Sequence, residues 1–205
     1  MHKIVVVDYG MGNLRSVQKA FERINFPALI SSKKKDIFSA DKLIIPGVGH
    51  FGKGMSNLKE LGLLETINDV VLEKKIPILG ICLGMQLMAK QSEEGNFAGF
   101  GWLDAEVVKF QVKDKLKYKV PHIGWNQIIQ KKESSLMKDI PDFSEFYFLH
   151  SYYIQCYNQV DILNETEYEC SFPSAIEKEN IFGVQYHPEK SHDVGGQLLK
   201  NFVNL

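Results

Sequence analysis

The feature that most constrains this chain is a single cysteine that stands between two glycines at the end of an apolar run. Residues 78–86 read Ile-Leu-Gly-Ile-Cys-Leu-Gly-Met-Gln. The apolar residues before the cysteine predict a buried strand and those after it predict a helix, so Cys82 falls on a sharp strand-to-helix turn. Such a turn strains the backbone, and Gly80 and Gly84 are small enough to relieve the crowding two residues away. The stretch therefore predicts an α/β fold that presents one thiol at the edge of a sheet.

The position of Cys82 just ahead of a helix favours chemistry at its sulfur. Unpaired amides and the dipole at a helix N-terminus stabilise a thiolate relative to a thiol. The amide of Leu83 is also placed to face an oxyanion that develops on a substrate. A cysteine in an apolar run is more often a core residue, so this stretch needs a second group before it indicates an active site.

The second group comes from residues 183–190, which read Gly-Val-Gln-Tyr-His-Pro-Glu-Lys. A strand of this pattern delivers His187 to the carboxyl edge of a parallel sheet, where Cys82 also emerges. Pro188 fixes the bend, and the carboxylate of Glu189 follows where it can accept a hydrogen bond from the imidazole. On its own, His-Pro-Glu is more typical of a solvated loop. Together with Cys82 it predicts a nucleophile, a base and a group that orients the base.

The remaining apolar runs predict a doubly wound arrangement of strands and helices. Asn13 is expected to cap the first helix, which ends before Pro27. Strands are expected at residues 3–8, 28–30, 43–45, 76–79, 104–110, 117–120, 127–130, 146–149, 152–157, 168–171, 175–177 and 181–185. Helices are expected at residues 14–24, 57–75, 83–90 and 194–202. We therefore expect an α/β fold in one domain, residues 1–205, whose central mixed sheet is mostly parallel, is flanked by helices and carries an antiparallel lobe at one edge.

Composition excludes several other classes of function. The formal net charge of -1 provides no basic field for nucleic acid or an anionic membrane, and no segment reads as a signal peptide or membrane span. The lysines within 33–35 and 113–119 are expected on solvated faces, the second set on a strand or hairpin. The three cysteines form no CxxC pair, so Cys156 and Cys170 are expected to be packing residues of a cytoplasmic protein. Neither a metal site nor a cofactor is expected.

The Cys82 turn and the His-Pro-Glu segment together resemble class I glutamine amidotransferases, over essentially the whole chain. Three further strings resemble one branch of that family, the glutaminase subunits of imidazole glycerol phosphate synthase in histidine biosynthesis. They are Pro-Gly-Val-Gly-His-Phe-Gly at 46–52, Pro-His-Ile-Gly-Trp-Asn at 121–126 and His-Ser-Tyr-Tyr at 150–153. The resemblance implies hydrolysis of glutamine with Cys82 as nucleophile, His187 as base and acid, and Glu189 as the residue that orients the imidazole.

The resemblance also implies how glutamine and the oxyanion are held. The matching positions are, in chain order, Val48, Gly49, Leu83, Gln86, Glu94, Ser151 and Tyr152. Glu94 would attract the α-amino group of glutamine, and the glycines at 47 and 49 would let a peptide turn its amide toward the oxyanion. Without the resemblance, Gln86 is more typical of an exposed helix face and Glu94 of an exposed acidic pair, while the glycine loop fits an ordinary turn.

The resemblance further implies a partner that uses the ammonia. Subunits of this branch dock on a (β/α)₈ barrel that carries a cyclase, and a chain of 205 residues is too short to hold that barrel as well. The positions that match the partner face are Asn13, Trp125, Asn126, Tyr147 and Lys190. A tryptophan is usually a core residue, and the expected loop at 124–126 is what favours Trp125 as an exposed anchor.

Other functions stay open at the level of the sequence. The same glutaminase could serve a sugar amidotransferase in surface polysaccharide synthesis, because the acceptor chemistry lies on the partner. A non-catalytic domain of this fold would be expected to lack one of Cys82, His187 and Glu189, which are all present. A γ-glutamyl peptide hydrolase would share the turn but would not need the string at 121–126.

Overall fold

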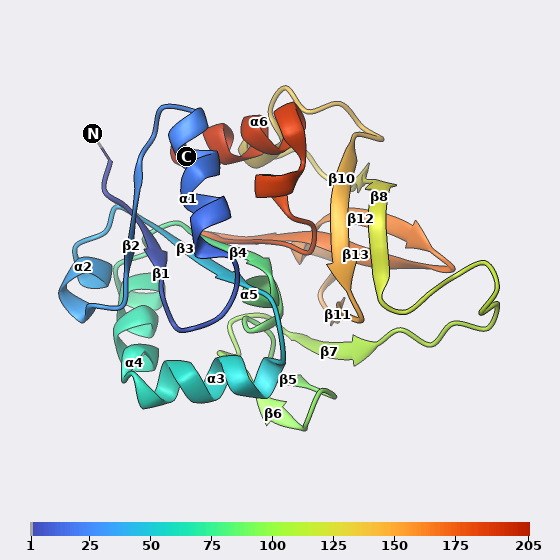
Figure 1. Ribbon diagram of the computed structural model, residues 1–205, viewed down its shortest axis with the longest axis horizontal. Helices are drawn as coiled ribbons and strands as arrows, with labels where there is room; N and C mark the ends of the chain where they lie inside the picture. Colours follow the sequence, from blue (N-terminus) through green and yellow to red (C-terminus); the bar gives the residue numbers. More distant parts are fainter. Residues whose placement is uncertain (1) are drawn as a thin grey trace.

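The computed structural model describes residues 2–205, and its centre is an eight-stranded sheet (Figure 1). The strands lie in the order β2, β1, β3, β4, β14, β13, β12, β9. Those from β2 to β14 are parallel, and the other three continue the sheet in antiparallel pairing. Their bounds are Ile4–Val7 (β1), Ala28–Ser31 (β2), Lys42–Gly47 (β3), Ile78–Cys82 (β4), Ile129–Gln130 (β9), Ile162–Tyr168 (β12), Cys170–Lys178 (β13) and Ile181–Val184 (β14). The predicted mixed, mostly parallel sheet with an antiparallel edge is confirmed.

Helices cover both faces of this sheet (Figure 1). On one face lie α1 (Leu14–Arg23) and α6 (His192–Val203). On the other lie α3 (Phe51–Glu60), α4 (Leu63–Asn68) and the π-helical turn η1 (Asp69–Glu73), while α2 (Lys34–Phe38) follows β2. In β1, Ile4 and Val6 pack in the core under α1 and α6, and Val5 and Val7 pack in the core under α3 and α4. Because both faces are covered, β1 is a continuous Ile and Val run rather than an alternating one.

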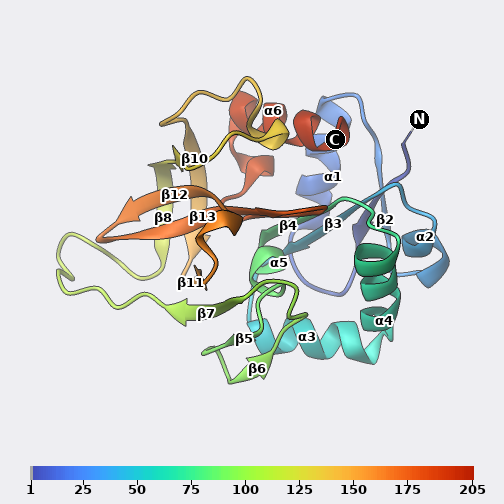
Figure 2. The ribbon, with the colours of Figure 1, turned by 180° about the vertical axis from the view of Figure 1, so that it is seen from behind.

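Two smaller sheets pack against the antiparallel strands of the central sheet (Figure 2). One pairs β8 (His122–Gln127) with β10 (Glu145–His150). The other has the order β11 (Tyr152–Cys156), β7 (Ala105–Lys109), β5 (Gln91–Ser92), β6 (Phe97–Ala98). Three single 3₁₀ turns complete the described elements, namely η2 (Ser135–Met137), η3 (Gln159–Asp161) and η4 (Pro188–Lys190).

The predicted helix at 57–75 is wrong in its start and in its continuity. α3 begins at Phe51, where the Glu94 carboxylate accepts a hydrogen bond from the Phe51 amide (2.7 Å) and the His50 ring accepts one from the Gly52 amide (3.1 Å). Gly62, with φ +63°, then separates α3 from α4. A capping carboxylate supplied from residue 94 is a tertiary contact, which local spacing does not reveal.

The predictions for the antiparallel part of the fold were wrong in three places. Residues 117–120 form no strand, so the lysines of 113–119 are exposed as expected but lie in a loop. Residues 124–126, expected as a loop, belong to β8, and β12 was missed. β8 owes its pairing to β10, with Trp125 opposite Tyr147, and a strand made by such long-range pairing is weakly encoded in local propensity.

The two cysteines that were expected to be packing residues differ in burial. Cys156 is buried as expected, but Cys170 is exposed, because it begins β13 directly after the turn at Glu169. Within residues 2–205, no helix combines the length and the apolar character that a membrane crossing requires. Over the same residues, no group of three or more His, Cys, Asp or Glu side chains is arranged to hold a metal ion.

Candidate active site

The predicted strand-to-helix turn at Cys82 is confirmed. Cys82 ends β4 with φ +53° and ψ -108°, a conformation that costs a non-glycine residue on the order of 1–3 kcal/mol. A Cβ on Gly84 would overlap the Ile45 carbonyl oxygen, and one on Gly80 would lie 2.6 Å from the Gly84 carbonyl carbon. Both glycines are therefore required by close backbone approach. The turn places the sulfur at the carboxyl edge of the parallel strands, opposite Gly47 at the end of β3.

The helix after the turn is shorter than predicted. α5 spans only Leu83–Gln86 instead of reaching Lys90, and its N-cap Cys82 makes no side-chain cap bond. A helix of one turn has a small dipole, so the expected dipole effect on the sulfur is weaker than the sequence suggests. The amide of Leu83 remains at the first helical position, where no intrahelical carbonyl accepts from it.

His187 and Glu189 form a buried pair beside Cys82. The His187 Nδ1 to Glu189 Oε1 distance is 2.8 Å, and only 1% and 4% of the two side chains is exposed. Burial alone would lower the pKa of His187, but the nearby Cys82 sulfur and the carboxylate of Glu189, which accepts its hydrogen bond, raise the pKa above the usual value. The imidazole is therefore held protonated near neutral pH, with Nδ1 donating to the carboxylate.

The opposite side of the His187 ring carries no protein partner. His187 Nε2 is buried without a hydrogen-bond partner among the described residues. A buried polar atom in that state costs about 1–3 kcal/mol and marks a position reserved for another group. Since Nδ1 is bonded to Glu189 and Cys82 also raises the pKa of this ring, Nε2 is the atom available to exchange a proton at the sulfur.

Backbone and hydroxyl contacts fix the segment that carries His187. The His187 amide donates to the Tyr147 carbonyl of β10 (2.8 Å). The completely buried Ser191 hydroxyl donates to the His187 carbonyl (2.6 Å) and accepts from the Tyr147 amide (3.0 Å). Arg23 of α1 donates to the Glu189 carbonyl (3.2 Å). The backbone that carries the imidazole is thus held by β10, by Ser191 and by α1, and the bond from Nδ1 to Glu189 orients the ring.

A cavity of about 310 Å³ opens at the sulfur and collects the residues that the sequence assigned to glutamine and to the oxyanion. Its lining includes Val48, Gly49, Cys82, Leu83, Gln86, Glu94, Ser151 and Tyr152. Gly49 has φ +126°, and a Cβ there would meet the Met11 side chain at 2.8 Å. The loop after β3 therefore depends on glycine at this position, as the sequence predicts.

Two of these lining residues already make structural contacts. Gln86 is buried, and its Nε2 donates to the Tyr152 carbonyl (2.9 Å) and to Gln185 Oε1 (3.0 Å). Glu94 caps α3 through the Phe51 amide and has its other carboxylate oxygen left for a ligand. The readings of Gln86 as an exposed helix residue and of Glu94 as a free surface acid do not hold.

Three of the predicted partner-face residues gather around one aromatic cluster. The Trp125 ring stacks on His192 at 5.0 Å and meets Tyr147 edge-on at 6.0 Å, and the Lys190 ammonium lies 5.4 Å from the Tyr147 ring centroid. Trp125 is 46% exposed, so it is available to a partner although it lies on a strand. Asn13 is exposed and caps α1.

Asn126 differs from the other partner-face candidates because its side chain turns inward. Its Nδ2 lies 3.0 Å from the Glu167 carbonyl and 3.4 Å from His122 Nε2, while its Oδ1 accepts from the Gln127 amide (2.8 Å). Alternation along β8 places it on the opposite face from Trp125. Asn126 therefore supports the strand rather than presenting free polar atoms.

Two features of this site were not predicted from the sequence. His122 Nδ1 lies 3.0 Å from His150 Nε2, and both rings are buried. Gln185 is completely buried, with Nε2 3.5 Å from Cys82 Sγ. The available signal for Gln185 was its spacing, since a residue two positions before His187 on an extended segment faces the same way. The two histidines carried no signal, because only β8–β10 pairing brings them together.

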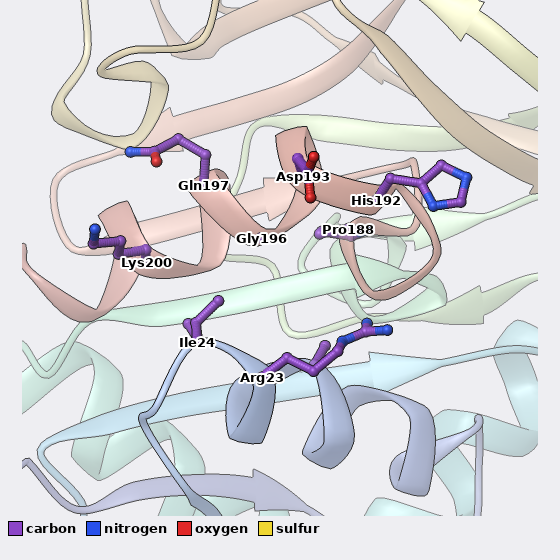
Figure 3. Close-up of a pocket in the computed structure, with 9 residues that line it drawn as sticks. Arg23, Ile24, Pro188, His192, Asp193, Gly196, Gln197 and Lys200 are labelled. Atoms are coloured by element: carbon purple, nitrogen blue, oxygen red, sulfur yellow. The ribbon is translucent and has the colours of Figure 1, made fainter.

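A second surface hollow lies beside Pro188 and contains no cysteine (Figure 3). It has a volume of about 390 Å³ and lies between α1 and α6, with Arg23, His192 and Lys200 in its wall. Arg23 is already bonded to the Glu189 carbonyl. The chemistry therefore belongs to the cavity at Cys82, and this hollow flanks the segment that supports it.

Comparisons with known proteins match nearly the whole chain. The family Glutamine amidotransferase class-I matches residues 5–205. The chain is 48% identical over 200 residues to the protein named imidazole glycerol phosphate synthase subunit HisH 2 of Methanococcus maripaludis, covering 98% of each. A protein of the same name from Pseudomonas aeruginosa is 45% identical, over 98% of this chain and 99% of the relative. The fold is similar to a chain in the structure of PurLQS from Thermotoga maritima, with a TM-score of 0.72 at 15% identity, covering 100% of this chain and 99% of that chain.

Proposed function

The chain belongs to the class I glutamine amidotransferases, and from this we propose that it is the glutaminase subunit of an imidazole glycerol phosphate synthase, which supplies ammonia in histidine biosynthesis. The observation that carries the proposal is the buried His187–Glu189 pair beside Cys82, at a cavity that collects the predicted glutamine-binding residues. Relatives named as this subunit match nearly the whole chain, which supports the same assignment.

The first half of the reaction forms a thioester. Cys82 Sγ attacks the carboxamide carbon of glutamine, and the resulting oxyanion accepts hydrogen bonds from backbone amides at Leu83 and in the Val48–Gly49 loop. The C–N bond then breaks as His187 Nε2 gives its proton to the departing ammonia. Glu189 keeps the ring oriented and stabilises its charged form throughout.

The second half returns the enzyme to its starting state. His187, now neutral, takes a proton from water, and the resulting hydroxide attacks the thioester carbon. The C–S bond breaks, glutamate leaves, and the sulfur departs as a thiolate beside the reprotonated imidazole. The proton count closes, because the proton given to ammonia is replaced by the one taken from water.

The ammonia is consumed by a partner rather than released. We infer a heterodimer in the cytoplasm with a cyclase that has a (β/α)₈ barrel, docked on the face that bears Trp125, Tyr147 and Lys190. Free ammonia is protonated in water and loses its nucleophilicity, so a channel through the barrel preserves it. Trp125, 46% exposed over aromatic neighbours, has the character of an interface anchor.

Docking also regulates the glutaminase. If the Val48–Gly49 peptide turns its amide toward the oxyanion only in the complex, the lone chain lacks a hydrogen bond worth about 3 kcal/mol in the transition state. The partner, and ligand at its acceptor site, would then raise the rate of hydrolysis by roughly a hundredfold or more. The positive φ of Gly49 supports this, because glycine permits both orientations of the peptide.

Steady-state glutaminase kinetics test the proposal. The rate is measured for the chain alone, with a cyclase barrel, and with the barrel and its ribonucleotide ligand. We expect slow hydrolysis alone and the largest rate in the third mixture. Fast hydrolysis by the lone chain that no partner changes would overturn the proposal in favour of a free-standing hydrolase. Activation only by a sugar amidotransferase would keep the chemistry and replace the pathway.

A further inference from the structure

Gln185 is a buried amide at the nucleophile that the mechanism above does not use. Its side chain is completely buried, with Nε2 3.5 Å from Cys82 Sγ and Oε1 3.0 Å from Gln86 Nε2. The segment is held in place because the Gln185 amide donates to the Ser174 carbonyl of β13 (2.8 Å). Which end of the Gln185 amide faces the sulfur decides what it does there, because only the nitrogen can donate.

A backbone carbonyl fixes that orientation. The Tyr152 oxygen can only accept, and it lies 2.9 Å from the Gln86 side chain, so Gln86 must present its Nε2 there. The same Tyr152 oxygen lies 2.8 Å from His150 Nδ1, which fixes that ring nitrogen as a second donor. With two donors the carbonyl is saturated, so the Gln86 amide has one stable orientation.

The orientation of the Gln86 amide fixes that of the Gln185 amide. Gln86 Nε2 has a second hydrogen, and it lies 3.0 Å from the Gln185 amide, where only an oxygen can accept. Gln185 therefore presents Oε1 to Gln86 and turns its Nε2 to the Cys82 sulfur. A flipped Gln185 amide would put two donors face to face in a buried site, which costs about 1–3 kcal/mol for the unmade bond.

We propose that Gln185 is a catalytic residue that donates an N–H to the Cys82 thiolate, with Gln86 as the positioning residue that fixes its orientation. The inference rests on the proposed glutaminase function. The donor stabilises the thiolate in the resting enzyme, and it stabilises the same sulfur again when the C–S bond of the thioester breaks. Gln185 thus gives the sulfur a donor that retains its proton, in addition to His187, which transfers one.

Alkylation of Cys82 by iodoacetamide, followed by peptide mass spectrometry across pH, tests the donor without requiring glutamine turnover. Gln185→Leu removes the donor at similar volume, and Gln185→Glu keeps an oxygen for Gln86 while replacing the nitrogen. Since a hydrogen bond to a charged group is worth roughly one to two pKa units, the pH of half-maximal alkylation should rise by about one unit in Gln185→Leu. It should rise by more in Gln185→Glu, because the carboxylate also repels the thiolate. Exposed Cys170 is the internal reference, and exposed Gln155→Leu is the matched control.

The outcomes separate this proposal from the proposed function. The donor role is supported if the alkylation pH of Cys82 rises in the Gln185 variants while the profile of Cys170 stays unchanged. Gln86→Leu should give a smaller rise. The kcat for glutamine should fall roughly tenfold in the Gln185 variants, with little change in KM. An unchanged Cys82 profile in Gln185→Leu and Gln185→Glu overturns it, even if glutamine hydrolysis is normal. If the unaltered complex hydrolyses no glutamine, the proposed function fails while the alkylation profile still decides the role of Gln185. Circular dichroism and ammonia-dependent synthesis by the complex identify a variant that fails to fold, and the remaining variants then decide.

Discussion

Two buried histidine systems lie near Cys82, and they hold opposite charge states. His187 is bonded to the carboxylate of Glu189, and its pKa is raised. His122 and His150 are bonded to each other, and burial lowers the pKa of His122 to about 4 and that of His150 to about 3. Burial opposes the charged form in both systems, so the difference comes from the partners.

The partners explain why one system is suited to proton transfer and the other to support. A carboxylate and a sulfur that becomes negative stabilise the imidazolium of His187, which can then give a proton to a leaving group. For His122 and His150, burial outweighs the hydrogen bond to the Tyr152 carbonyl, which favours a charged His150, so both rings stay neutral and transmit orientation without changing charge. The presence of a buried histidine therefore does not by itself indicate proton transfer. The group bonded to its ring, a carboxylate or a second imidazole, decides its charge.

Removing the charged system should have the largest effect. We expect His187→Ala to lower glutamine-dependent synthesis by the complex by roughly 10⁴-fold or more, because one member of an acyl-transfer unit is lost. Cys82→Ala should behave alike. Ammonia-dependent synthesis, measured in the same complexes with added ammonium salt, should stay near the unaltered rate. Loss of both activities in Cys82→Ala would instead indicate a structural role for the turn.

Removing the charge of Glu189 should make His187 behave more like the neutral pair His122 and His150. In Glu189→Gln, the amide oxygen can still accept from His187 Nδ1, but the charge that favours the imidazolium is gone. We expect the pKa of His187 to fall and glutaminase activity to drop by roughly a hundredfold, less than for Cys82→Ala. The pH profile of kcat measures both, with exposed Glu179→Gln as control. A loss as large as that in Cys82→Ala would show that Glu189 does more than orient the ring.

Sequence alone predicted the parts of this fold and site that depend on local geometry. The turn at Cys82 needs small residues at fixed spacing, and Pro188 fixes His187 relative to Glu189 within one short segment. The central sheet followed from buried Ile and Val runs, which need no partner to be recognised as strands. Asn13 was predicted as a cap from its place just before the first helix. Its side-chain oxygen accepts a hydrogen bond from the Ser16 amide, a contact within the same turn.

What sequence could not predict depends on contacts between distant segments. β8 exists because β10 pairs with it, and α3 starts at Phe51 because Glu94 caps it from another element. The donor at Cys82 is likewise decided by the Tyr152 carbonyl, through Gln86 and Gln185. Family resemblance supplied the residues at the cavity, but not the hydrogen bonds that orient them.

The smallest effect should come from the neutral pair, through stability rather than turnover. Below pH 6.5 the unfolded chain protonates His122 and His150, whereas the folded protein keeps them neutral until about pH 4 and about pH 3, so stability falls as pH falls through this window. His187 has the opposite sign, because its raised pKa gives stability that is lost as pH rises above 6.5.

Urea unfolding at pH 7 and pH 5 should show a loss of about 2 kcal/mol for each neutral histidine. His122→Asn, whose amide can replace the Nδ1 donor, should reduce that loss by about the same amount, while exposed His2→Asn should leave it unchanged. An identical pH dependence in His122→Asn and the unaltered chain would show that the partners of the second pair do not set its charge, and the contrast between the two systems would fail.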